Sequence, residues 1–179
     1  MDFGRIHKKL AEAQFFLGKM TEQEHSNRTF GDRQREFDFY LSAFLNAAMS
    51  VRGGFHYRQN RMRNQAIKEW RARWENNLSP QELSLYEFMV DDRNDEVHES
   101  GSSRTVGEKG VPLPVGRYQS RRDSIFVSDD VVGSSSPNLI FRPSYSFTID
   151  GADCEATEAC RKYLALLQRM VAEFEADHP

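Results

Sequence analysis

The sequence predicts a mainly α-helical protein, an up-and-down bundle of four to five helices with a small antiparallel β insertion before the last helix. Three observations support this fold class. Apolar residues recur every three or four positions through the first hundred residues and again over residues 160–174, as they do on one face of a helix. Residues 141–149 instead alternate apolar and polar side chains, which is typical of a half-buried strand. A capping sequence at residues 79–82 marks a helix start.

The first two helices are predicted from apolar stripes over residues 6–20 and 37–48. Gly31 is expected in the turn between them. Asp32 is expected to be the N-cap of the second helix, because its carboxylate can accept a hydrogen bond from a free amide of the first turn. Gly53-Gly54 is expected to end that helix, since glycine is common just after a helix C-terminus.

A third helix is predicted around Ile67, Trp70 and Trp74, whose spacing places both indoles in the bundle core. The fourth helix should begin at Ser79-Pro80-Gln81-Glu82, where serine is the N-cap, proline is N1 and glutamate is N3. It should run to about Glu99. The last helix is predicted from a stripe that comprises Cys160, Tyr163, Leu164, Leu167, Met170, Val171 and Phe174.

The β insertion is expected at about residues 104–150. Its best strand is residues 141–149, which we expect at a sheet edge because Pro143 cannot donate a hydrogen bond to a neighbouring strand. Residues 125–132 and, less regularly, residues 111–118 are the other predicted strands. Two roles stay open for the insertion: a hairpin laid over the bundle, or a flap that moves and has a function of its own.

The composition indicates a folded chain without a membrane span. The chain has 179 residues, of which 39% are hydrophobic, enough to bury a core in one domain. No run of 18 apolar residues occurs and the N-terminus has no apolar signal segment, so a cytoplasmic protein without membrane contact is expected. Cys154 and Cys160 are expected as reduced thiols. The histidines lack metal-ligand spacing and no cofactor motif is present, so neither metal nor cofactor is expected.

The net charge of −3 hides two oppositely charged blocks. Residues 52–74 carry seven basic residues and one acidic residue, whereas residues 75–99 carry one basic and eight acidic residues. One interpretation is that two solvated helix faces attract each other. The other is a local polyanion-binding surface, because the local field matters more to a ligand than the total charge.

Polar residues interrupt the apolar stripe of the fourth helix in its last two turns. The predicted inward stripe comprises Leu83, Tyr86, Val90 and Val97. Arg93, Asn94 and His98 flank it, in positions where a buried guanidinium would be costly unless paired. Histidine can move a proton near neutral pH and arginine can bind a phosphate, so the set suits phosphodiester chemistry without a metal. The simpler alternative is that Arg93 pairs with a neighbouring carboxylate and that these cations only complete the helix C-terminus.

The segment Arg93-Asn94-Asp95-Glu96-Val97-His98 resembles the arginine-polar-x3-histidine motif of the HEPN superfamily, the higher eukaryotes and prokaryotes nucleotide-binding domains. The aromatic approach over residues 85–90 and the aromatic- and alanine-rich helix over residues 37–48 agree with it. The resemblance covers roughly residues 5–100 and the last helix. It implies a single HEPN-like helical domain over residues 1–179, whereas the insertion has no counterpart in the common core of the family.

The resemblance implies a dimeric bundle, because many members are metal-independent endoribonucleases whose two motifs meet in one composite site. Many of these are toxins or defence proteins, so an antitoxin protein is a possible partner. On this basis His98 would be the general base or acid for attack by the ribose 2′-OH, Arg93 would bind the scissile phosphate and Asn94 would position the histidine. The residues assigned to RNA contact are Arg58, Arg61, Arg63, Arg71 and Arg73.

Two other functions stay open from the sequence. Some HEPN proteins have lost catalysis, so the chain could be a non-catalytic module that binds RNA or another protein. It could also be a nucleotide-binding regulator whose insertion closes over a ligand.

Overall fold

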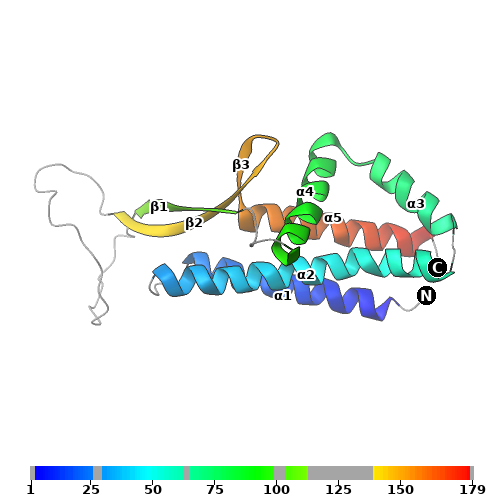
Figure 1. Ribbon diagram of the computed structural model, residues 1–179, viewed down its shortest axis with the longest axis horizontal. Helices are drawn as coiled ribbons and strands as arrows, with labels where there is room; N and C mark the ends of the chain where they lie inside the picture. Colours follow the sequence, from blue (N-terminus) through cyan, green and yellow to red (C-terminus); the bar gives the residue numbers. More distant parts are fainter. Residues whose placement is uncertain (1–2, 26–29, 63–64, 99–103, 113–138, 178–179) are drawn as a thin grey trace, which may run out of the picture.

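The computed structural model of the chain describes residues 3–25, 30–62, 65–98, 104–112 and 139–177. Helices and strands follow one another within these ranges in the order shown in Figure 1. They are α1 (Gly4–His25), α2 (Phe30–Met62), α3 (Gln65–Asn76), α4 (Pro80–His98), β1 (Thr105–Pro112), β2 (Leu139–Ile149), β3 (Ala152–Glu155) and α5 (Ala156–Asp177).

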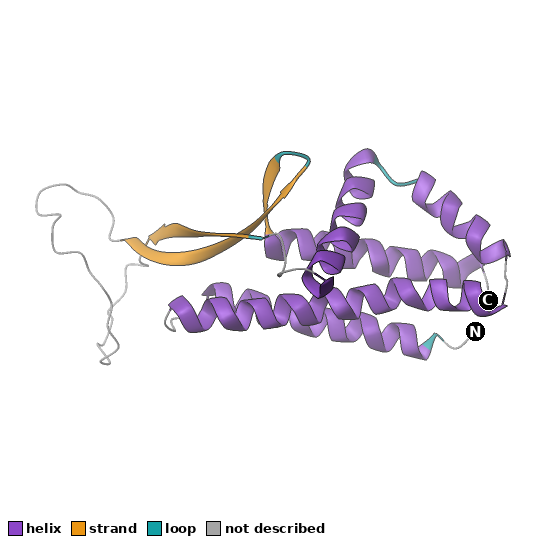
Figure 2. Ribbon diagram, in the orientation of Figure 1, coloured by secondary structure: helices purple, strands orange, loops and turns teal. Residues whose placement is uncertain are grey.

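The predicted fold class is confirmed: a helical bundle carries a small antiparallel sheet that comes before the last helix. Helices α1, α2 and α5 run side by side along the long axis, while α4 lies across them and packs on α2 and α5 (Figures 1 and 2). The inward face of α1 is the predicted stripe from Ile6 to Met20, and it is buried. None of the described helices is both long and apolar enough to cross a membrane.

Helix α2 is longer at both ends than the sequence predicts. It begins at Phe30, so Asp32 lies inside the first turn and the prediction that it is the N-cap is wrong. The helix also continues through Gly53-Gly54 to Met62, so the prediction that these glycines end it is wrong. A close approach explains Gly54: a Cβ there would lie 3.2 Å from Cγ1 of Ile6 on α1.

Helix α3 packs its two tryptophans into the core, as predicted. Trp70 and Trp74 are buried, and the Trp70 indole Nε1 donates a hydrogen bond to Asp177 Oδ2 at 2.6 Å near the end of α5. The Trp70 ring also meets Phe174 edge-on, with 4.8 Å between ring centroids. These contacts hold α3 against the C-terminal end of α5.

The sheet has the strand order β1-β2-β3, so β2 is the central strand and its predicted edge position is wrong. The reason is a strand that is absent from the predicted elements: Ser146–Ile149 of β2 pair with Ala152–Glu155. Asp150 and Gly151 form the turn between β2 and β3, with φ values of 52° and 76°, which a two-residue hairpin turn of this kind requires. Pro143 pairs with Glu108 of β1, in the part of β2 that β3 does not reach.

The base of the sheet is fastened to the bundle by aromatic contacts. The Tyr145 ring stacks on Phe37 of α2, with centroids 3.7 Å apart, and Phe147 packs against Phe88 of α4 at 5.2 Å. From this base the β1–β2 ladder extends away from one end of the bundle (Figure 2). The predicted strand at residues 125–132 and most of the one at 111–118 lie outside the described residues.

Candidate functional site

The motif residues lie on the last two turns of α4, a helix that begins with the predicted capping box. The Ser79 amide donates a hydrogen bond to Glu82 Oε2 at 2.9 Å, and the Glu82 amide donates one to Ser79 Oγ at 3.3 Å. These reciprocal bonds satisfy free amides at the helix start. The helix then runs to His98, so Arg93 and His98 sit five residues apart at its C-terminal end. The side chain of His98 lies outside the described residues.

Helix α4 is rotated relative to the predicted stripe. Its buried side chains are Leu85, Tyr86, Met89 and Asp92. Leu83 and Val90 are only half-buried, so the prediction that the inward stripe runs through Val90 is wrong. The rotation brings Asp92, the residue just before the motif, into the protein interior.

Contacts of the Tyr86 ring hold α4 in this observed orientation. The ring packs edge-on against Trp74 of α3, with 5.8 Å between centroids, and against Tyr163 of α5 at 6.0 Å. The Tyr86 hydroxyl accepts a hydrogen bond from Arg52 Nε at 3.0 Å. Burial raises the pKa of Tyr86, which therefore stays a neutral phenol at physiological pH. A phenol that contacts three helices in this way determines which face of α4 turns inward.

Arg93 is half-buried, and only some of the donors of its guanidinium form hydrogen bonds with described residues. Nη1 donates a hydrogen bond to Asn94 Oδ1 at 3.4 Å, whereas the buried Nε has no hydrogen-bond partner among the described residues. No carboxylate in the described part of the chain forms an ion pair with Arg93. Asn94 therefore contacts the arginine through its side-chain oxygen, and its predicted contact to His98 stays a prediction. The free donors of Arg93 can bind an oxyanion.

A buried polar layer lies at the same end of the bundle, where α1 ends and α5 begins. The most buried polar side chains of the described residues are Gln23, Asp92 and Thr157, at 7%, 2% and 3% exposure. Thr157 Oγ1 donates a hydrogen bond to Glu24 Oε1 at 3.0 Å. Burial, and then the charges of Asp92 and Glu24, raise the pKa of the Cys160 thiol well above its usual value. These residues place polar chemistry in the core beside the end of α4, where an apolar core would be expected.

The predicted apolar stripes do not include these polar residues, although the spacing of each one matches the inward face of its helix. Asp92 follows Leu85 by seven positions and Met89 by three, which is the spacing of one helix face. A stripe that included these two residues would have placed Asp92 inside. The same spacing marks the other two residues, because Gln23 follows Met20 by three positions and Thr157 precedes Cys160 by three and Leu164 by seven.

An anchor formed by Arg104 holds the chain shortly after α4. The Arg104 guanidinium forms an ion pair with Asp38 Oδ1 of α2 and lies over the Tyr145 ring, 5.5 Å from its centroid. Its side chain is 12% exposed. Six peptide steps separate His98 from Arg104 and span roughly 20 Å at most. The end of α4 is thereby kept near α2 and β2.

The arginines assigned to RNA contact do not gather at the motif in the described part of one chain. Arg71 and Arg73 lie on α3, where Arg71 Nε forms an ion pair with Glu75 Oε1 at 3.1 Å and Arg73 is exposed. Helix α3 leads into the first turn of α4, while Arg93 lies roughly 20 Å further along the axis of α4. The side chains of Arg58, Arg61 and Arg63 lie outside the described residues.

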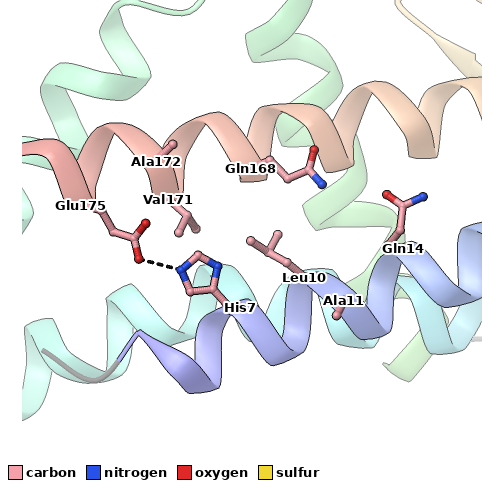
Figure 3. A pocket seen from close by; sticks show the side chains of 8 residues that line it. All are labelled: His7, Leu10, Ala11, Gln14, Gln168, Val171, Ala172 and Glu175. Atoms are coloured by element: carbon pink, nitrogen blue, oxygen red, sulfur yellow. Dashed lines mark hydrogen bonds and ion pairs between the residues drawn. The ribbon is translucent and has the colours of Figure 1, made fainter.

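A groove of about 330 Å³ lies away from the motif, between α1 and α5 (Figure 3). At one end of it His7 points toward Glu175, and His7 Nε2 donates a hydrogen bond to Glu175 Oε1 at 2.7 Å. Leu10 and Val171 contribute apolar surface to its floor, and none of the lining residues belongs to α4. The groove is therefore a separate feature from the Arg93 end of the molecule.

The described residues contain no group of three or more histidine, cysteine, aspartate or glutamate side chains arranged to bind a metal ion. In the described part of α4, the guanidinium of Arg93 keeps donors that suit an anionic ligand. Comparison of the chain with protein-family models, with curated proteins and with solved structures found no significant match.

Proposed function

We propose that the chain is a metal-independent endoribonuclease of HEPN type that cleaves RNA through attack of the ribose 2′-OH. The observation that carries the proposal is the state of Arg93. It is half-buried in the last turns of α4, five residues before His98, with a buried Nε that has no partner among the described residues. A half-buried guanidinium that has no carboxylate partner among the described residues keeps Nη donors for a phosphate group.

In the proposed reaction Arg93 binds the non-bridging oxygens of the scissile phosphate and stabilises the charge that grows on them. His98 accepts the proton of the 2′-OH, whose oxygen attacks phosphorus. The P–O5′ bond breaks, the departing 5′ oxygen takes up a proton, and a 2′,3′-cyclic phosphate remains. Asn94 holds the guanidinium through the 3.4 Å bond from Arg93 Nη1 to its Oδ1.

We propose that the active form is a homodimer in which the α4 ends of two copies build one composite site. A second copy would supply the second histidine and arginine, and it would also provide basic residues that one chain holds apart from its own motif. The basic residues on α3, Arg71 and Arg73, are the proposed RNA contacts in the described part of the chain. A toxin or defence role, with an antitoxin as partner, belongs to the same proposal.

The test is cleavage of a single-stranded RNA in EDTA by the wild type, Arg93→Ala and His98→Ala. Both substitutions are expected to reduce cleavage by at least about 10²-fold, the range usual for loss of a general base or an oxyanion donor. Arg93→Lys keeps the charge but loses the planar fork, so it should restore only part of the activity. Wild-type rates in either alanine variant would remove these residues from the site.

Arg35→Ala is the matched control, because Arg35 is an exposed arginine of α2 outside the proposed site. It should cleave RNA at the wild-type rate. RNA binding by the wild type without any cleavage would favour the alternative, a non-catalytic binding module.

A further inference from the structure

The outward face of α1 carries a stripe of residues whose spacing and side-chain sizes are nearly symmetric about its central residue. Lys8, Ala11, Phe15, Gly18 and Glu22 follow one another at steps of three and four residues, so they lie along one face of the helix. All five are exposed. A phenylalanine stands at the centre, a small residue lies on each side of it, and opposite charges lie at the two ends.

Phe15 is one of the exposed large apolar residues in the described part of the chain, with a relative accessible surface of 57%. Its ring touches Phe16 edge-on at 5.4 Å between centroids, and the Lys19 ammonium lies 5.7 Å from its centroid. These contacts leave most of the ring in water. Ala11 and Gly18 border the shallow grooves between α1 and α5, which Gln14 also lines.

Gly18 lies in the middle of α1, where glycine costs roughly 0.5–1 kcal/mol relative to alanine. A Cβ at Gly18 would meet nothing within 4 Å. Packing within the described chain therefore does not require a glycine here, in contrast to Gly54, which Ile6 approaches closely. An approach by another backbone from outside is a physical reason for a small residue at this place.

We propose that α1 docks on α1 of a second copy of this chain, antiparallel, about a two-fold axis at Phe15. The axis brings the two Phe15 rings together and sets Ala11 and Gly18 of one helix opposite Lys19 and Glu12 of the other. Lys8 lies seven residues before Phe15 and Glu22 lies seven after it, so each Lys8 faces Glu22 of the other copy. The contact is isologous, since both copies use the same surface.

The ion pairs available within the chain agree with this arrangement. Lys8 forms no ion pair with any described residue, whereas Glu22 binds Lys19 at 2.7 Å and keeps 62% of its side chain exposed. Glu22 thus has oxygen surface left for a second cation. This face of α1 contains none of the α4 residues, so the contact is distinct from the proposed composite site and does not rest on it.

Sedimentation equilibrium over a series of protein concentrations, at low salt and without RNA, tests the proposal by charge exchange. Lys8→Glu and Glu22→Lys each replace two attractive pairs by two repulsive ones, so each should weaken self-association at least about tenfold. The double variant restores opposite charges and should return to within about threefold of wild type. Phe15→Ser should also weaken association.

Lys68→Glu on α3 is the matched control, because Lys68 is an exposed lysine away from this face; it should associate as the wild type does. A wild type that stays monomeric at every concentration overturns the proposal. So does association that is equal in Lys8→Glu, Glu22→Lys and the double variant. In that second case the copies meet elsewhere, and the proposed ribonuclease site is unaffected.

Discussion

At the scale of single residues, the end of α4 combines a buried carboxylate with an arginine that lacks an ion-pair partner among the described residues. Asp92 is 2% exposed, and Arg93 follows it directly. Helical geometry turns consecutive residues about 100° apart, so one points inward while the next reaches the surface. Burying an apolar side chain at position 92 would cost less desolvation free energy than burying a carboxylate. The polar layer is therefore a feature that core stability alone does not explain.

Reactivity of the two thiols checks the layer directly. Cys160 is completely buried and the pKa of its thiol is raised by burial, Asp92 and Glu24, whereas Cys154 is half-buried. Because the thiolate is the reactive form, Cys154 should react first with a disulfide reagent such as Ellman's reagent. Cys160 should react only when the chain unfolds. Two equally fast thiols in the native protein would contradict the described packing; Cys154→Ser identifies which thiol gives each phase.

At the scale of elements, the start of α4 depends on the Ser79–Glu82 capping box. The hydrogen bond from the Ser79 amide, followed by the one from Arg169, holds the pKa of Glu82 below its usual value. A depressed carboxyl pKa contributes stability above the unfolded-state pKa, and this contribution is lost as pH falls through the folded-state value. The capping box should therefore stabilise the protein at neutral pH, and this contribution to the free energy of unfolding should be lost in acid.

Glu82→Gln tests this pH dependence. The variant should be less stable than the wild type at pH 7, and the difference should shrink between about pH 5 and pH 3 as the wild-type carboxylate is protonated. Urea unfolding at several pH values measures it. Glu87→Gln, on the exposed side of the same helix, is the control. A constant difference across this range would show that the charge of Glu82 plays no part in the cap.

The sheet shows how far local signals reach at this scale. The alternation over residues 141–149 predicted β2 correctly. Asp150-Gly151 is a dipeptide typical of a hairpin turn, so the sequence also carried a signal for the turn into β3. The position of β2 in the sheet could not be predicted from Pro143. Strand order depends on which segment pairs with each edge, and β3 covers only the last four residues of β2.

At the scale of the whole molecule, the packing of α1 on α2 brings the two helices close together at Gly54. Gly53 and Gly54 lie side by side within α2, but a Cβ would have open space at Gly53 and would meet the Ile6 side chain at Gly54. Comparing the two positions distinguishes two effects. One is the intrinsic cost of glycine in a helix, and the other is the space that packing against α1 leaves for a side chain.

Alanine substitutions at the two positions measure that constraint. Gly53→Ala should raise the free energy of unfolding by about 0.5–1 kcal/mol, because alanine loses less backbone entropy on folding. Gly54→Ala should gain less than this or lose stability, because its new methyl group must displace Ile6. Urea unfolding of both variants measures the two changes in the free energy of unfolding. Equal gains would mean that α1 yields freely at this contact.

The sequence alone predicts that the helices form and roughly where they lie, because each apolar stripe repeats at the helical period and the capping box marks a helix start. It also located Arg93, Asn94 and His98 near the end of one helix. Only the tertiary structure decided that α2 continues past its glycines, that α4 turns Asp92 inward and that β2 is central. These depend on contacts between segments far apart in the chain, such as Ile6 with Gly54. Around Asp92 the local spacing fits either of two inward faces of α4, and it does not choose between them.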